Sequence, residues 1–168
     1  KRIRNDLKYK LIRGNVDTRI KKLNENLFDA IILSYAGIKS LNITNNISQI
    51  FSISEIIPSA GQGVIALQCR KNDDTIIKLL NKINHQKTHC CVLAERNVLK
   101  ILEGDCETAV GIYAKIIDKK IILEAELFSL DGTQRFYLKS TKDLNLALEL
   151  GKEVGEILKK KSKNSYKK

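Results

Sequence analysis

The clearest hydrophobic pattern lies in the second half of the chain. Apolar or weakly polar side chains recur at helical spacing at Cys91, Ala94, Val98 and Leu102, which predicts a helix over residues 88–102. A second amphipathic helix is predicted near the end of the chain, over residues 143–160. These two helices need a common apolar surface to cover.

Three strands supply that surface. They are predicted at residues 110–117, 121–128 and 134–140. The middle one alternates cleanly, because Leu123, Ala125 and Leu127 share one face while Glu124 and Glu126 share the other. The pair Asp131-Gly132 indicates a hairpin between the second and third strands. We therefore predict a three-stranded antiparallel sheet with helices on one face, an α+β domain.

The first half has a different pattern. Residues 8–12 are predicted to form a short strand, residues 16–24 a helix, residues 28–34 a strand and residues 35–41 a short helix. The run 28–34 is almost continuously apolar, which is typical of a strand buried on both faces. This order predicts a parallel βαβ unit with a right-handed crossover, part of an α/β domain. Two parallel strands are too few to stand alone as a sheet.

The centre of the chain carries its only proline, Pro58, close to Gly61 and Gly63. This composition favours a hinge or domain boundary. A strand is predicted after it at residues 64–69 and a helix at residues 74–83, with Asp73 or Asp74 as its N-cap.

Composition limits the class of protein. The 168 residues are 43% hydrophobic, and no apolar run approaches the length of a membrane span. The first residues include neither an initiator Met nor an apolar leader, so we expect a piece of a longer protein. The net charge is +11, but residues 159–168 hold six lysines and no acid, which leaves +5 for the rest (+11 minus 6). We expect residues 161–168 to be a disordered basic tail.

The four cysteines, Cys69, Cys90, Cys91 and Cys106, form no disulfide framework, and we expect a reducing, cytoplasmic compartment. His85 and His89 lie near two of them, but no second ligand pair follows at zinc-site spacing. Because Cys91 continues the apolar stripe of its helix, we predict no metal site.

One candidate site is the turn that joins the first predicted strand to the helix at residues 16–24. The free N–H groups and the dipole of a helix N-terminus favour an anion there, and Asn15 is a natural N-cap. Gly14 lets the backbone approach a ligand, and Arg13 and Arg19 flank the turn. A guanidinium group binds a carboxylate through two hydrogen bonds. An ordinary capped helix with two surface arginines gives the same local pattern.

The second candidate is Cys106, in the loop after the helix that we expect to end at Gly104. A thiol in such a loop is accessible to reactants, whereas one inside a helix or strand usually is not. By itself this pattern also fits a loop thiol with no function.

Taken together, the motifs resemble porphobilinogen deaminases, also called hydroxymethylbilane synthases. In chain order they are residues 13–16 with Thr18 and Arg19, residues 28–33 leading into 36–39, Pro58 with residues 61–63, residues 94–96, and Gly104 with Cys106. The resemblance covers the chain apart from the lysine tail. It implies a transferase of tetrapyrrole and heme biosynthesis that joins four porphobilinogen molecules with release of ammonia.

The resemblance also implies the roles of the site residues. Cys106 matches the cysteine that carries a covalent dipyrromethane cofactor through a thioether, and Arg13 and Arg19 match positions that hold carboxylates of the cofactor or substrate. The substrate would be porphobilinogen, without nucleic acid or membrane partners, and the complete enzyme would be a monomer. Asp105, Ala109 and Ser40 depart from the residues usual in the family.

Family architecture implies a further division of the chain. Residues 1–57 would be the later part of the second α/β domain, 58–83 a hinge with a return strand and helix of the first domain, and 84–160 the third, α+β domain. The catalytic aspartate would lie in the missing first domain, so we expect the isolated chain to be inactive. Two other classes remain open: a periplasmic-type module that binds a carboxylate at Arg13 and Arg19, and a basic nucleic-acid-binding module.

Overall fold

The computed structural model describes residue 4, residues 6–105 and residues 107–167. The chain divides into two compact units, an N-terminal unit that ends at Ser52 and a C-terminal unit that begins at Ile53. Each unit is described by itself.

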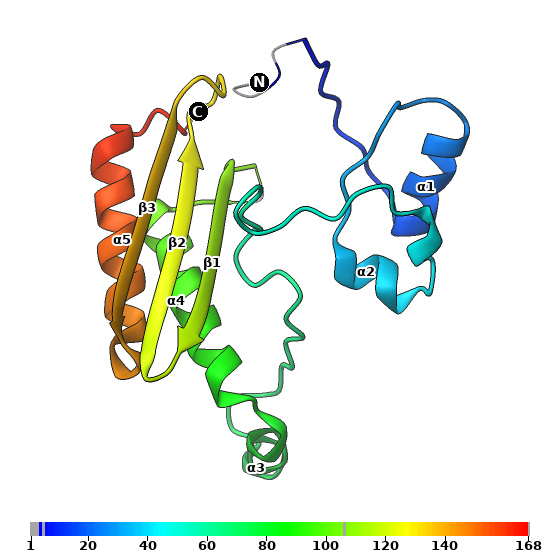
Figure 1. The fold of residues 1–168 in the computed structure, drawn as a ribbon. Coiled ribbons are helices and arrows are strands. Elements are labelled where there is room, and N and C mark those ends of the chain that lie inside the picture. The colour runs from blue at the N-terminus through cyan, green and yellow to red at the C-terminus, as the bar shows by residue number, and fades with distance from the viewer. Residues whose placement is uncertain (1–3, 5, 106, 168) are drawn as a thin grey trace. The chain divides into compact units, whose positions relative to one another are not determined.

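The C-terminal unit is built on a three-stranded antiparallel sheet in the order β1-β2-β3 (Figure 1). The strands are β1 (Val110–Ile117), β2 (Lys120–Phe128) and β3 (Arg135–Asp143). Ile112 pairs with Ala125, which pairs in turn with Leu138, so apolar side chains from all three strands meet on one face. The predicted antiparallel sheet is confirmed, with Asp131 and Gly132 in the connection between β2 and β3.

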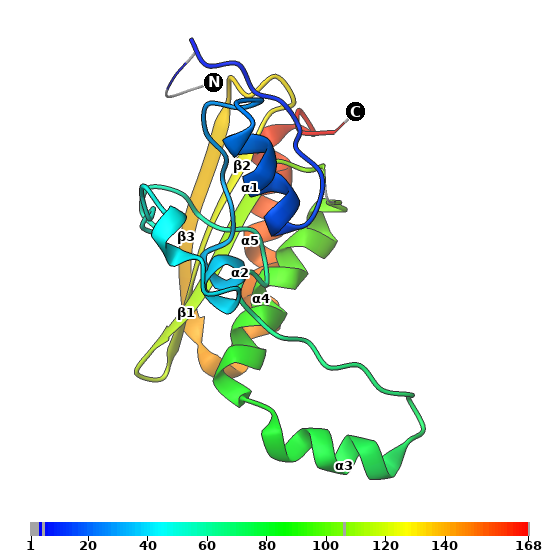
Figure 2. The same cartoon turned by 90° about the vertical axis from the view of Figure 1, so that its right-hand side faces the viewer.

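Two long helices cover that apolar face, α4 (Gln86–Leu102) and α5 (Ala147–Ser162), as Figure 2 also shows. The core between the two layers is fully buried and includes Val98, Leu102, Leu123, Leu150 and Val154. The helices approach each other very closely: a Cβ atom placed on Gly151 would lie 2.3 Å from the carbonyl oxygen of Ala94. The absence of a side chain at Gly151 thus allows this packing.

A buried carboxylate joins α4 to the edge of the sheet and to the hinge segment. Glu95 is only 6% exposed. Its Oε1 accepts the N–H of Ala114 in β1 at 2.8 Å, and its Oε2 accepts the N–H of Gly61 at 2.7 Å. The N–H of Ile112 donates to the carbonyl of Pro58 at 2.7 Å. Residues 57–61 therefore lie alongside β1, and Pro58 accepts the Ile112 N–H on the open edge of this strand. No strand of the described chain covers that edge.

The helix α3 (Asp74–Ile83) has the predicted bounds, and Asp73 is its N-cap, since its carboxylate accepts the N–H of Ile76 at 3.2 Å. The helix buries none of its residues. Ile65, Leu67, Leu79 and Ile83 are all exposed along this part of the chain, with Ile65 at 89%. This stretch presents an amphipathic pattern without the apolar surface that it would cover.

The N-terminal unit contains α1 (Val16–Asn24), α2 (Tyr35–Ser40) and the 3₁₀ turn η1 (Thr44–Asn46). Both α-helices match the predicted positions, but neither has a buried residue. Leu11, Leu27 and Ile32 are all more than half exposed. The unit has helices in the expected order and no hydrophobic core of its own among its described residues.

The predicted strands at residues 8–12, 28–34 and 64–69 are wrong for this chain, because the structure has no strand at any of them. The βαβ arrangement of the first half is therefore not formed. A strand needs a neighbour to pair with its backbone N–H and C=O groups, and a continuous apolar run also needs layers on both faces. The described residues supply neither to these segments.

The prediction of a disordered tail is also wrong for residues 161–167. The helix α5 continues to Ser162, and Tyr166 beyond it is 4% exposed. The Tyr166 hydroxyl donates to the carbonyl of Leu102 at 2.9 Å. Like charges along a lysine run favour disorder, but a buried aromatic ring with a satisfied hydroxyl outweighs that local repulsion here.

We expect Glu95→Gln to destabilise the C-terminal unit by about 1–3 kcal/mol, because an amide has one acceptor oxygen where two buried N–H groups need acceptors. Burial raises the pKa of the Glu95 carboxyl above its ordinary value, although the hydrogen bonds from Gly61 and Ala114 oppose this shift. Relief of the buried charge in the variant offsets only part of the loss. Urea denaturation followed by circular dichroism measures the difference.

The matched control is Glu156→Gln, which removes the charge of an exposed carboxylate 3.8 Å from Lys152. Such a pair contributes less than about 0.5 kcal/mol. Equal stability losses in the two variants would contradict the role of Glu95.

Because the pKa of Glu95 is raised in the folded state, protonation of this carboxyl stabilises the folded state relative to the unfolded one. This contribution to the free energy of unfolding decreases as pH rises through the raised pKa.

Candidate functional site

The turn before α1 has the geometry of an anion-binding site. Asn15 stands at the N-cap position with extended backbone angles, but its side chain makes no capping hydrogen bond. The first N–H groups of α1 therefore lack that side-chain acceptor, and they can donate to a ligand. Asp17 is the acidic side chain in this first turn, and it is the competing negative charge.

Gly14 shapes this turn. Its φ of +124° is one that residues with a side chain rarely adopt, and a Cβ atom there would lie 2.8 Å from the Thr18 methyl carbon. The glycine thus lets the chain turn tightly onto the first turn of α1. Glycine is thus needed at this position for two separate reasons, the backbone angle and the space beside Thr18. The predicted approach of a ligand to Gly14 stays a prediction.

Arg13 and Arg19 both lie at this turn. The Nε of Arg19 donates to the carbonyl of Gly14 at 2.7 Å, and this hydrogen bond holds the Arg19 side chain against the backbone of the turn. Lys22 donates to the carbonyl of Arg13 at 3.0 Å and adds a third positive charge. Among the described residues, neither guanidinium forms an ion pair with a carboxylate. The turn therefore combines free helix N–H groups with cations, a combination suited to a carboxylate.

The second candidate, Cys106, lies outside the described residues, so only its neighbours are characterised. The helix α4 ends at Leu102, the last residue of the predicted range 88–102, and Glu103 caps it in the left-handed conformation with φ of 54°. The N–H of Gly104 donates to the carbonyl of Leu99 at 3.0 Å, which closes the last turn. The loop that contains Cys106 thus begins from a well-formed helix end.

Asp105 organises this loop. Its Oδ1 accepts the N–H groups of Glu107 and Thr108 at 2.9 and 3.0 Å and the Thr108 hydroxyl at 3.1 Å. These donors, the Glu107 N–H first, lower the pKa of the Asp105 carboxyl below its usual value. The departure at Asp105 has a structural role that the sequence did not reveal: its carboxylate binds the backbone N–H groups of Glu107 and Thr108, the two residues that follow position 106.

The other cysteines are in different environments. Cys69, Cys90 and Cys91 are free thiols. Burial, followed by the nearby charge of Glu95, raises the pKa of the Cys91 thiol, which disfavours the nucleophilic thiolate there. His85 is the N-cap of α4, and its Nδ1 accepts the N–H of Thr88 at 3.4 Å. No group of three potential metal ligands occurs among the described residues.

One cavity of about 310 Å³ lies in the C-terminal unit, between the hinge segment, the first turns of α4 and the edge of β1. Its lining includes Gln62, Lys87, Cys91, Glu95 and Tyr113. It includes none of the predicted site residues. The two candidate sites belong to different units, Arg13 and Arg19 to the N-terminal one and the loop around Asp105 to the C-terminal one.

Glu95 has no predicted role from its sequence pattern, although its position is informative. An acidic residue at helical spacing within the stripe of Cys91, Val98 and Leu102 indicates a buried carboxylate with backbone partners. Tyr166, a single aromatic residue in a lysine run, was the corresponding signal in the tail. No helix in the described part of the chain is long and apolar enough to cross a membrane.

Comparisons with known proteins agree on one family. Residues 1–78 match the model "Porphobilinogen deaminase, dipyromethane cofactor binding domain", and residues 89–160 match "Porphobilinogen deaminase, C-terminal domain". The Desulforamulus reducens porphobilinogen deaminase is 37% identical over 155 residues, which are 92% of this chain and 50% of that protein. The enzyme of Staphylococcus carnosus is 40% identical over 156 residues, again 92% and 50%.

A chloroplastic porphobilinogen deaminase of Oryza sativa is 36% identical over 159 residues, 93% of this chain and 44% of that protein. The chain spans about half the length of the relatives it matches. None of the relatives named above is a periplasmic binding protein or a nucleic-acid-binding protein. Both family models and all three relatives carry the same name, and the chain belongs to the porphobilinogen deaminase family.

Proposed function

We propose that this chain is the cofactor-holding part of a transferase that joins four porphobilinogen molecules into hydroxymethylbilane and releases ammonia at each step. The observation that carries the proposal is the match of two porphobilinogen deaminase domain models, one of them named for the cofactor, to residues 1–78 and 89–160. The substrate is porphobilinogen, and the working enzyme is a cytoplasmic monomer with no nucleic-acid partner. The free thiols are compatible with a reducing compartment.

We propose Cys106 as the residue that carries dipyrromethane, through a thioether formed by its sulfur atom. The described neighbours fit this role, since the Asp105 carboxylate accepts the N–H groups of Glu107 and Thr108 and so links the residues before and after position 106. The half-buried Cys91 is a poor alternative because its thiol pKa is raised. When attached, dipyrromethane serves as the primer for the growing tetrapyrrole.

The turn before α1 is proposed to hold carboxylates of the cofactor or substrate. Arg13 is exposed, and Arg19 donates only through Nε within the described residues, so guanidinium N–H groups remain for a ligand. The free N–H groups of the first turn of α1 add donors of the same polarity. These residues can bind and orient a polycarboxylate but supply no general acid or base.

The domain assignments are part of the proposal. Residues 1–57 are the later part of the second α/β domain. Residues 58–83 are a hinge and a return segment that belongs to the first domain. Residues 84–160 form the third, α+β domain, which carries Cys106. The exposed apolar side chains of Ile65, Leu67 and Leu79 support the assignment of residues 58–83, because they need an apolar surface to cover.

Cys106→Ser should abolish the dipyrromethane adduct in the complete enzyme, because a serine hydroxyl is a much weaker nucleophile than a thiolate. Intact-protein mass spectrometry measures the adduct directly. Cys91→Ser is the matched control and should retain it. An adduct that persists in Cys106→Ser would contradict the assignment.

Arg13→Lys in the complete enzyme should lower kcat/KM for porphobilinogen by roughly 10- to 100-fold, since a lysine cannot form the paired hydrogen bonds of a guanidinium group. Arg19→Lys should have at least as large an effect, because it also loses the contact to Gly14. Steady-state kinetics tests both, with Lys21→Ala on the exposed side of α1 as control. Unchanged kinetics in both arginine variants would exclude this turn as a binding site.

The 168-residue chain alone should not convert porphobilinogen to hydroxymethylbilane. It covers about half the length of its relatives, and its N-terminal unit has no buried core among the described residues. The assay is colorimetric detection of the tetrapyrrole after oxidation, with a complete relative as positive control. Turnover by the chain itself would show that the catalytic residues lie within it.

A further inference from the structure

The end of α4 needs hydrogen-bond donors from outside the helix. The last carbonyl groups of an α-helix have no partner within it. Here the N–H groups of Glu103 and Gly104 turn back to the carbonyls of Lys100 and Leu99. The carbonyls of Ile101 and Leu102 remain, and the loop that contains Cys106 follows them directly.

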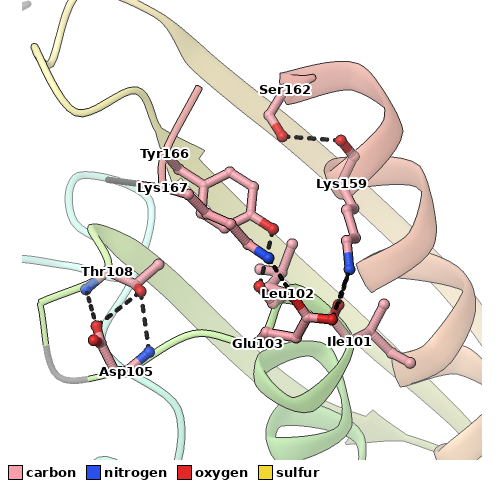
Figure 3. A network of polar contacts seen from close by, with 9 residues as sticks. All are labelled: Ile101, Leu102, Glu103, Asp105, Thr108, Lys159, Ser162, Tyr166 and Lys167. Carbon is pink, nitrogen blue, oxygen red and sulfur yellow. Dashed lines mark hydrogen bonds and ion pairs between the residues drawn. The ribbon is translucent and has the colours of Figure 1, made fainter. Parts of the chain in front are cut away.

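The C-terminal end of the chain supplies those donors (Figure 3). The buried Tyr166 donates its hydroxyl to the carbonyl of Leu102 at 2.9 Å. Lys159, on the last turns of α5, donates to the carbonyl of Ile101 at 3.3 Å. Both contacts join residues that are more than fifty positions apart in the sequence.

Glu103 is held by the same segment. Each of its two carboxylate oxygens forms an ion pair with a different lysine, one with Lys159 at 3.1 Å and the other with Lys167 in a short contact. These two lysines, Lys167 foremost, lower the pKa of the Glu103 carboxyl. Two ammonium groups at a helix C-terminus also interact favourably with the helix dipole. The left-handed residue at which the chain leaves α4 is thus fixed from two sides.

The residues after α5 are also anchored to the connection between β2 and β3. The N–H of Leu130, in the connection between β2 and β3, donates to the carbonyl of Ser165 at 2.9 Å. The Ser162 hydroxyl donates to the carbonyl of Lys159 at 3.1 Å and closes the end of α5. Residues 163–167 therefore form a strap between the sheet and the end of α4, and we refer to them as the C-terminal strap.

We propose that the C-terminal strap is a positioning element for the loop at residues 104–108: Tyr166 and Lys167, with Lys159, fix the end of α4 and thereby the loop that Asp105 organises. This inference rests on the function proposed for Cys106 and adds residues that the family motifs do not include. It also gives the lysine-rich end of the chain an internal role. Lys159 and Lys167 neutralise Glu103.

The first test is amide hydrogen exchange on the 168-residue chain. Tyr166→Phe and Lys167→Ala each remove one contact and keep the remainder of the strap. Each should speed exchange of the Glu107 and Thr108 amides by about five- to tenfold, the order expected for the loss of one such hydrogen bond. Amides of Ile112 and Ala114 in the sheet should exchange as before. Lys167→Arg, which keeps the cation, should restore protection.

Lys161→Ala is the matched control, because Lys161 is an exposed lysine in the last turn of α5, just before the strap. It should leave loop exchange unchanged. Exchange that stays slow in Tyr166→Phe and Lys167→Ala would overturn the proposal. So would a rise of equal size over loop and sheet, since the strap would then only stabilise the whole unit.

The second test measures how fast the complete enzyme acquires its dipyrromethane adduct from porphobilinogen, by intact-protein mass spectrometry. Lys167→Ala should slow loading by about fivefold, as one lost contact predicts, and Lys167→Arg should restore it. Unchanged loading in Lys167→Ala would overturn the positioning role. If the wild type never carries an adduct while loop exchange still responds to the strap variants, the strap is supported and the function proposed for Cys106 fails.

Discussion

The C-terminal unit depends on the buried carboxylate of Glu95. Glu95 accepts hydrogen bonds from Gly61 and from Ala114, which lie 34 and 19 residues away in the sequence. A buried carboxylate is costly unless backbone donors surround it, and the raised pKa of Glu95 expresses that cost. The arrangement persists because the same carboxylate satisfies an edge donor of β1 and attaches the hinge segment to the sheet. Without it, two N–H groups and residues 57–61 would lose their anchor.

The helix that carries Glu95 also connects the remaining features. Its middle packs against α5 at Gly151, where a side chain would collide with the carbonyl of Ala94. Its C-terminal end is where Glu103, the organised loop at Asp105 and the C-terminal strap meet. Any displacement of α4 is therefore transmitted to the loop that follows it. A rigid helix end is a suitable support for the covalent dipyrromethane that we propose at Cys106.

The two units differ in how complete they are. The C-terminal unit has a closed core between its sheet and helices, so it stands as a domain. The N-terminal unit has helices and the turn proposed to bind carboxylates, but no buried residue in α1 or α2. The residues of its segment 28–34 are mostly apolar, as in a buried strand. Exposed apolar side chains also follow Gly63 in the C-terminal unit. This contrast agrees with a chain that spans about half the length of its family relatives.

The sequence alone determined what depends on neighbours along the chain. Amphipathic spacing located α1, α3 and α4, and alternation located the strands of the sheet. The N-cap of α3 was predicted as Asp73 or Asp74, and it is Asp73. Helix caps and hairpins are local structures, so the chain alone indicates them. The five motifs between Arg13 and Cys106, taken together in chain order, were sufficient to identify the family.

Only the tertiary structure decided which of the remaining segments find partners. Strand formation at residues 8–12, 28–34 and 64–69 requires neighbouring strands that composition cannot supply, so these apolar runs were misassigned. Conversely, the lysine-rich end was predicted to be disordered. It is ordered because Tyr166 donates a hydrogen bond to the carbonyl of Leu102, 64 residues earlier in the sequence. Glu95 likewise acquired its role from backbone donors that lie 34 and 19 residues away in the sequence. In each case the deciding interaction joins groups that the chain brings together only on folding.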